Sequence, residues 1–136
     1  MANYDSAILK VLKNEGGYVN DPADKGGETY KGISRKNWGS WGGWINIDGA
    51  KKRSNFPKSL YSNVLLNNLV IEFYKKHFWQ PVGCDDIKDQ DIADMLVDSA
   101  VLEGIRPAVK RAQKICGLTQ TGVVSEELKT KLNSLV

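Results

Sequence analysis

Hydrophobic residues recur along most of the chain at the three- and four-residue spacing of amphipathic helices. The strongest such pattern covers residues 62–78, where we predict a single helix that Pro81 and Gly83 end. The apolar positions that we expect on its buried face are Leu65, Leu66, Leu69, Val70, Phe73, Tyr74 and Phe78.

The second half of the chain predicts three further helices. Residues 87–103 form the first, with Gly104 just past its end. The next begins near Pro107, which suits a first helical turn, and ends at Gly117. Ser125 is suited to cap the last helix, because its hydroxyl can accept a hydrogen bond from a free backbone N–H.

Glycine is concentrated near the start of the chain, where nine of the thirteen glycines precede residue 50. The first third is therefore expected to be rich in loops, with a short hairpin over residues 21–33. With 136 residues and 41% hydrophobic content, the chain is long enough for one core but short for two domains. We predict one mainly α-helical domain over residues 1–136, with a small irregular or β lobe after the first helix and a helical C-terminal lobe.

A short first helix is predicted over residues 5–14, with Asp5 as its cap and Gly16 just beyond its end. Its apolar face is expected to contain Ile8, Leu9 and Leu12. Glu15 would then lie at the C-terminal end of a helix, where the negative end of the helix dipole disfavours an ionised carboxyl group. A glutamic acid that keeps its proton near neutral pH is suited to act as a general acid, for example toward a departing glycosidic oxygen.

Glycoside hydrolysis needs a second carboxylate across a gap from the acid. Asp24 on the glycine-rich loop is our candidate for this role, and the Thr29 hydroxyl is placed to fix a water molecule. Glu28 and Asp21 are alternatives, although Asp21 precedes a proline and is more typical of a turn. The spacing alone leaves open that these acids are turn residues or solvated charges.

The stretch EGGYVNDPADKGGETYKGIS, residues 15–34, resembles the opening motif of glycoside hydrolase family 108. This family consists of bacterial and phage N-acetylmuramidases that cut peptidoglycan, and its catalytic acid is the glutamate of the Glu-Gly-Gly-Tyr motif, which corresponds to Glu15. The order of residues is also similar to that of phage-type lysozymes, in which an aspartate and a threonine position the attacking water; they match Asp24 and Thr29. The resemblance implies a lysozyme-like α+β fold.

Two later segments are also similar to the family. EFYKKHFWQPV, residues 72–82, looks like the family's helix that ends in Tyr-Trp. DSAVLEGIRPAVKRAQKICGLTQTG, residues 98–122, is similar to its predicted peptidoglycan-binding region. The resemblance therefore implies a catalytic lobe over residues 1–80 and a peptidoglycan-binding helical segment over residues 81–136.

Trp38, Trp41 and Trp44 recur every third residue in the glycine-rich stretch NWGSWGGW. Exposed indole faces stack on sugar rings, so we predict that these residues bind substrate. Tyr18 and Tyr30 flank the acids and are expected to line the same groove. Ordinary packing within the lobe is the alternative for each of these five side chains.

The net charge of +3 is spread along the chain and favours a negatively charged partner. No basic motif with aromatic residues accompanies this charge, so we expect peptidoglycan glycan strands rather than nucleic acid as the partner. His77 has no acid or cysteine at ligand spacing, and neither a metal nor another cofactor is expected. Cys84 and Cys116 are expected to be small buried residues, with one disulfide bond as the alternative.

The N-terminal stretch has neither a basic leader nor an unbroken apolar run, so we expect no Sec signal and no membrane insertion. We expect a monomer that is made in the cytoplasm. The family resemblance implies that it acts in the periplasm or on the cell wall after holin-type release or dedicated export.

Three functions remain open at this point. In an inverting muramidase, Glu15 protonates the leaving oxygen while Asp24 and Thr29 direct water at the anomeric carbon. A lytic transglycosylase would use Glu15 alone as acid and base. A noncatalytic wall-binding module would keep the motif for its loop geometry. A departure from the family pattern favours this alternative, since family members usually carry Asn where this chain has Leu102 or Glu103.

Overall fold

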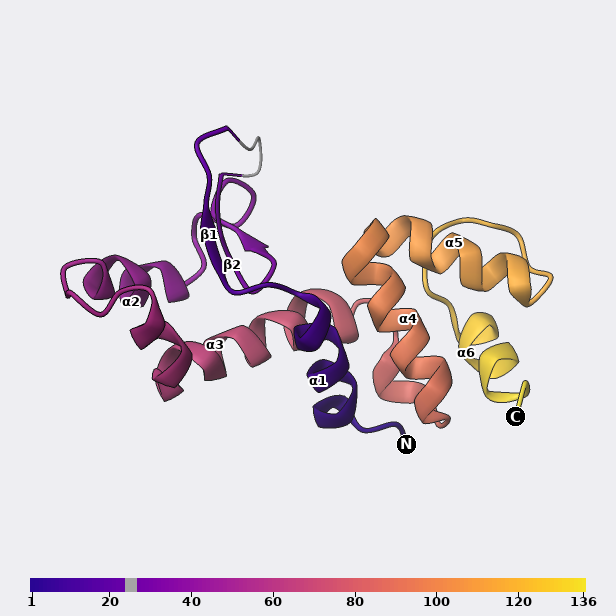
Figure 1. Cartoon of the computed structure of the whole chain (residues 1–136). Helices are drawn as coiled ribbons and strands as arrows, with labels where there is room; N and C mark the ends of the chain where they lie inside the picture. The colour runs from indigo at the N-terminus through magenta and orange to yellow at the C-terminus, as the bar shows by residue number, and fades with distance from the viewer. Residues whose placement is uncertain (24–26) are drawn as a thin grey trace. The chain divides into compact units, whose positions relative to one another are not determined.

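The computed structural model describes residues 1–23 and 27–136 and shows a mainly helical protein with one small antiparallel sheet (Figure 1). Residues 12–73 form one compact unit, and residues 1–11 form another together with residues 74–136. The predicted fold class, mainly helical with a small β lobe after the first helix, is confirmed.

The sheet belongs to the unit of residues 12–73. Its strands are β1 (Tyr18–Asn20), β2 (Glu28–Tyr30) and β3 (Ile33–Ser34). β2 is the central strand and pairs antiparallel with both neighbours, so that Thr29 lies opposite Val19 on one side and Ser34 on the other. The predicted hairpin is therefore part of a larger sheet that gains a third strand, because the chain reverses again directly after β2.

The remaining elements of this unit are α2 (Gly43–Ala50), a 3-10 turn (Lys58–Ser62) and α3 (Val64–Tyr74). Leu66, Val70 and Phe73 of α3 are buried at the predicted four- and three-residue spacing. Leu65 was predicted on the same face but is 64% exposed. The apolar stripe of a surface helix is roughly 100° wide, and Leu65 lies outside it.

The predicted helix over residues 62–78 does not keep regular α-helical geometry to its end. After Tyr74 the chain forms a π-helical turn, Lys75–Trp79. A π-helical turn contains more residues than an α-helical turn and so changes which side chains face inward. Trp79 is consequently buried, whereas Phe78, which regular spacing places on the buried face, is only half-buried.

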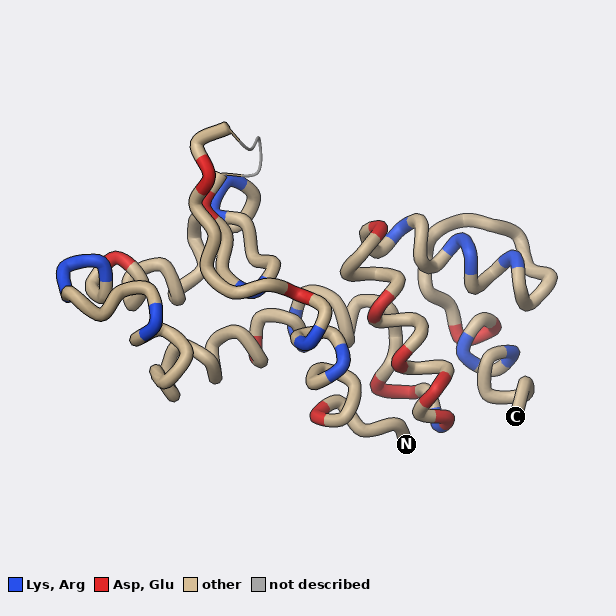
Figure 2. The backbone as a smooth tube through the Cα atoms, viewed as in Figure 1, with Lys and Arg blue, Asp and Glu red and all other residues tan. Residues whose placement is uncertain are grey.

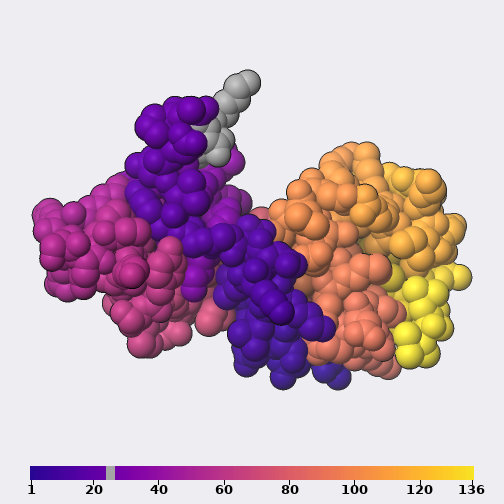
Figure 3. All heavy atoms as spheres, in the orientation of Figure 1, coloured from indigo at the N-terminus to yellow at the C-terminus, as the bar shows by residue number. Residues whose placement is uncertain are grey.

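The other unit contains most of the C-terminal half. Its elements are the first part of α1 (Tyr4–Asn14), the π-helical turn (Lys75–Trp79), a 3-10 turn (Cys84–Asp86), α4 (Gln90–Glu103), α5 (Ile105–Ile115) and α6 (Glu126–Asn133). α5 packs against α4, α6 packs against α5, and the orange and yellow spheres of these helices form one block in Figure 3. Gly104, with a φ of 98°, separates α4 from α5 at the predicted helix end. Within the described ranges, no helix has both the length and the apolar character required to span a bilayer.

The two predicted helix caps have different outcomes. The Ser125 side chain accepts a hydrogen bond from the backbone N–H of Leu128 at 3.2 Å, so this cap of α6 is confirmed. Asp5 as the cap of α1 is wrong. The helix begins one residue earlier than predicted, and the Asn3 side chain accepts the hydrogen bond from the Ser6 N–H at 3.1 Å instead.

The buried face of α1 also differs from the predicted one. Ile8 is buried as expected, but Leu9 is 70% exposed. Ala7 and Val11 complete the buried face, because Val11 lies four positions after Ala7 and three positions after Ile8.

Both cysteines are free thiols, so the alternative of a disulfide bond does not apply. Cys84 is buried, and burial raises the pKa of its thiol to about 12. Burial also raises the pKa of the half-buried Cys116. Since the thiolate is the nucleophilic form, neither cysteine is suited to covalent catalysis.

Candidate active site

Glu15 follows directly after the last residue of α1 and lies half-buried on a bend of the chain. This confirms its predicted place at the C-terminal end of a helix. The backbone carbonyl groups of a last helical turn have no partner further along the helix and carry partial negative charge. The negative end of the helix dipole therefore disfavours the ionised form of a carboxyl group at this position.

Gly17, the second glycine after Glu15, allows the chain to pass close to a tyrosine. A Cβ atom at Gly17 would overlap the side-chain hydroxyl of Tyr61, so the close approach requires glycine. The same Tyr61 hydroxyl accepts a hydrogen bond from the backbone N–H of Tyr18 at 3.0 Å. The Glu-Gly-Gly-Tyr motif is thus held against the segment that precedes α3.

Thr29 is the middle residue of β2 and is half-buried. Because side chains alternate along a strand, Thr29 points to the opposite face of the sheet from Glu28 and Tyr30. Asp24, the predicted second carboxylate, lies outside the described residues. Its role and that of Thr29 stay predictions.

Glu28, the alternative second carboxylate, is held by three donors. The Tyr18 hydroxyl donates to its Oε2 at 2.6 Å, Arg35 binds its Oε1 at 3.0 Å, and Lys51 Nζ lies 2.5 Å from Oε2. The side chain is only 11% exposed. Burial by itself would raise the pKa of this carboxyl group, but the hydrogen bonds from Lys51, Tyr18 and Arg35 outweigh it and lower the pKa. Glu28 is therefore a fixed, charge-balanced anion.

Asp48 extends this cluster from the sheet to α2. Its two carboxylate oxygens each accept a hydrogen bond of 2.7 Å from the Arg35 guanidinium group, which is a bidentate pair. The Arg35 hydrogen bonds hold the pKa of Asp48 well below its usual range. We call Glu28, Arg35, Asp48 and Lys51 the ionic cluster; it connects β2 and the chain after β3 to α2.

Replacing Glu28 with glutamine is expected to lower the free energy of unfolding at neutral pH and to have a smaller effect in acid. The pKa of Glu28 in the folded protein is below its ordinary value of 4.5, so ionised Glu28 stabilises the fold above that pH. This stabilisation is lost as the pH falls through the lower folded-state pKa. Urea unfolding of both proteins at about pH 7 and about pH 3 measures the change.

Glu72→Gln on α3 is the matched control for this prediction. Glu72 is exposed and forms no ion pair with another described residue, so its substitution should give no such pH-dependent difference. A difference between native protein and Glu28→Gln that is equal at both pH values would contradict the ionic role of Glu28.

The tryptophan-rich segment forms an aromatic cluster around Trp44, which is 2% exposed. The Trp44 Nε1–H donates to the carbonyl of Trp38 at 2.9 Å, and the guanidinium group of Arg35 lies 5.2 Å from the centre of its ring. Trp41 contacts Trp44 edge to face with ring centres 5.5 Å apart, and Trp38 contacts Phe73 in the same way at 4.9 Å. Packing is therefore a main role of this segment.

Two of the five predicted sugar-binding aromatics are fully enclosed. Tyr30 is 0% exposed, and its hydroxyl donates to the Asn67 side chain at 2.8 Å, while burial raises its pKa to about 12. A buried ring has no free face for a sugar, so Tyr30 and Trp44 are core residues rather than substrate contacts. Tyr18, Trp38 and Trp41 are half-buried, and their predicted contact with substrate stays a prediction.

Tyr61, Asn67 and the partners of Glu28 in the ionic cluster were not predicted from the sequence. A usable signal existed for Lys51, because Asp48 precedes it at the three-residue spacing of a helical ion pair. Tyr61 and Asn67 had no such local signal, because their partners lie far away in the sequence. Within the described part of the chain, no three acidic, histidine or cysteine side chains are grouped to hold a metal ion.

The family model described as glycosyl hydrolase 108 matches residues 8–104 of this chain. The chain belongs to this family. The match contains Glu15, all three strands and the aromatic cluster, whereas α5 and α6 lie beyond it. The predicted resemblance to the family is confirmed, and the protein is a glycoside hydrolase whose family implies peptidoglycan as its glycan substrate.

A solved structure supports the family 108 assignment. The structure of Brucella abortus SagA is 26% identical to this chain, with a TM-score of 0.67, and the similarity covers 98% of this chain and 70% of that one. The family 108 chain has no significant match among curated proteins. Because the similarity to SagA covers 98% of this chain, it supports the fold over nearly the whole length of the protein.

Proposed function

We propose that this family 108 protein is an N-acetylmuramidase that cleaves the bond between N-acetylmuramic acid and N-acetylglucosamine, with Glu15 as general acid. The observation that carries the proposal is that Glu15, inside the family match, follows the last residue of α1. At this position the helix dipole favours the protonated carboxyl group that the first step requires.

In the proposed reaction, Glu15 gives its proton to the glycosidic oxygen as the bond from that oxygen to the anomeric carbon breaks. A water molecule attacks the anomeric carbon from the opposite face, directed by Asp24 and Thr29, and loses a proton to Asp24. This sequence inverts the anomeric configuration and needs a separation of roughly 6.5–9.5 Å between the two carboxyl groups.

The geometry of Glu28 argues against this alternative carboxylate as the catalytic base. A catalytic base must accept a proton, but the Glu28 carboxylate is stabilised in its ionised form by Arg35, Lys51 and Tyr18. These contacts lower its affinity for a proton. We therefore propose a structural role for Glu28.

We also propose that the protein reaches its substrate by release or export to the cell wall, as its family implies.

Mass spectrometry of digested peptidoglycan tests the proposed reaction. Hydrolysis is expected to yield muropeptides with free reducing ends, and proton NMR during the digestion should show the inverted anomer first. Anhydro-muramic ends would instead mean that Glu15 acts as acid and base of a lytic transglycosylase. Binding to the wall without any cleavage product would mean a noncatalytic module and would refute the proposal.

A further inference from the structure

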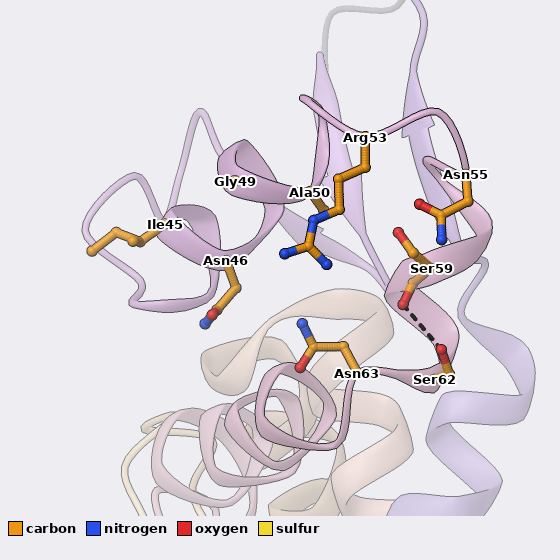
Figure 4. Close-up of a pocket in the computed structure, with 9 residues that line it drawn as sticks. All are labelled: Ile45, Asn46, Gly49, Ala50, Arg53, Asn55, Ser59, Ser62 and Asn63. Carbon is orange, nitrogen blue, oxygen red and sulfur yellow. Dashed lines mark hydrogen bonds between the residues drawn. The ribbon is translucent and has the colours of Figure 1, made fainter.

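The unit of residues 12–73 contains a pocket of about 500 Å³ that none of the predicted catalytic residues lines. It lies between the outer part of α2, the loop that follows, and the start of α3 (Figure 4). Its volume falls within the range of small-molecule sites, roughly 300–1,000 Å³. The structure thus contains a second candidate site in the same unit as Glu15.

The lining of this pocket is polar and contains no acidic residue. The side chains that carry polar groups are Asn46, Arg53, Asn55, Ser59, Ser62 and Asn63. Figure 4 shows the Arg53 guanidinium group and the Asn63 amide pointing into the space between α2 and the 3-10 turn. Amide and hydroxyl groups match the hydroxyl and acetamido groups of sugars as hydrogen-bond partners.

Much of this hydrogen-bonding capacity is not used within the described residues. The side chains of Asn46, Arg53 and Asn55 form no hydrogen bond or ion pair with them, and the Ser59 hydroxyl oxygen is buried without a partner there. The Asn46 and Asn55 amides and the Arg53 guanidinium group are therefore free to form hydrogen bonds with a ligand.

The charge around the pocket is positive. Residues 49–71 contain four basic residues and no acidic residue, and Figure 2 shows the basic residues after α2 in blue. Lys51 is neutralised by the ionic cluster. Lys52, Arg53 and Lys58 are exposed and have no acidic partner among the described residues. An anionic group on the ligand would therefore meet uncompensated positive charge, with Arg53 as its direct contact.

We propose that this pocket binds an N-acetylated sugar that carries an anionic group, with the carboxylate or phosphate on Arg53 and the sugar hydroxyl and acetamido groups on the asparagine and serine side chains. The choice of a cell-wall sugar rests on the proposed function, whereas the preference for an anion rests on the pocket. The site gives the enzyme a second hold on the wall polymer, independent of Glu15.

Calorimetric titration of the native chain with three sugars tests this site. N-acetylmuramic acid supplies a carboxylate, N-acetylglucosamine 6-phosphate supplies a phosphate, and N-acetylglucosamine is the neutral control. At least one anionic sugar is expected to bind at least about tenfold more tightly than the neutral one, since a hydrogen bond to a charged group is stronger than a neutral one. Which of the two binds identifies the carboxylate or the phosphate as the group recognised.

Two variants connect the binding to the pocket. Arg53→Gln is expected to weaken binding of the anionic sugar by about tenfold or more, with Lys36→Gln outside the pocket as the control of equal charge change. Gly49→Leu is expected to weaken binding, because its side chain would occupy part of the pocket, and a Cβ atom there meets nothing within 4 Å. Gly42 has the same free space but does not line the pocket, so Gly42→Leu is the matched control.

Equal binding of neutral and anionic sugars, or binding unchanged in both pocket variants, would overturn the inference.

The test is separate from that of the catalytic proposal, because Glu15→Gln should bind the anionic sugar as the native chain does. Arg53→Gln should still cleave a short soluble muramyl oligosaccharide while it loses activity on intact sacculi. A native chain that binds the sugar but cleaves no wall would refute the muramidase proposal and leave the pocket standing.

Discussion

Glu15→Gln is expected to reduce kcat for peptidoglycan cleavage by about 10²–10⁴-fold, the usual contribution of a positioned general acid. The amide has nearly the same shape as the carboxylic acid but has no acidic proton for the leaving oxygen. Glu15 is half-buried at the end of α1 in the native protein, and glutamine fits the same space without a change in charge at low pH. Release of soluble muropeptides from purified peptidoglycan measures the loss.

The control for Glu15→Gln is Glu72→Gln, the same chemical change on the exposed surface of α3. It should keep the native kcat, and both variants should unfold at the native urea concentration. A Glu15→Gln protein that is folded and retains full activity would exclude Glu15 as the acid. A protein that loses activity because it is unfolded would be recognised by its circular dichroism spectrum.

Trp44→Ala is expected to lower the free energy of unfolding by about 3–5 kcal/mol, the range for removing a large aromatic side chain from a core. The native ring is 2% exposed and contacts both Trp41 and the guanidinium group of Arg35. Alanine would leave a cavity and would also leave the Trp38 carbonyl without the indole N–H. Urea unfolding followed by far-UV circular dichroism measures the change.

Two further substitutions separate packing from sugar binding in this prediction. Trp44→Phe keeps most of the ring and should lose clearly less stability than Trp44→Ala. Trp38→Ala should also lose less, because Trp38 is only half-buried. If Trp44→Ala were as stable as the native protein but bound the wall more weakly, the core role would be contradicted and Trp44 would be a substrate contact.

Local pattern predicted the helices well where their geometry is regular. The three- and four-residue spacing identified α3, α4, α5 and α6, and the capping serine and the stop at Gly104 were also found. The pattern failed after Tyr74, where a π-helical turn changes which residues face inward and buries Trp79. Such a turn has no periodic signal of its own, since it depends on what the helix packs against.

The amino-acid order was sufficient to place Glu15 directly after a helix and to identify the family, because helix ends and short motifs depend on neighbouring residues. It was not sufficient to decide which tryptophan would be buried. Trp38, Trp41 and Trp44 have the same local spacing, and only packing against Phe73 and Arg35 separates the enclosed ring from the half-exposed ones. The charge state of Glu28 also depends on the tertiary structure, because the cation nearest to it, Lys51, lies just after α2 and 23 positions away in the sequence. Contacts of this kind form only when distant segments pack together, so their physical consequences cannot be read from local sequence.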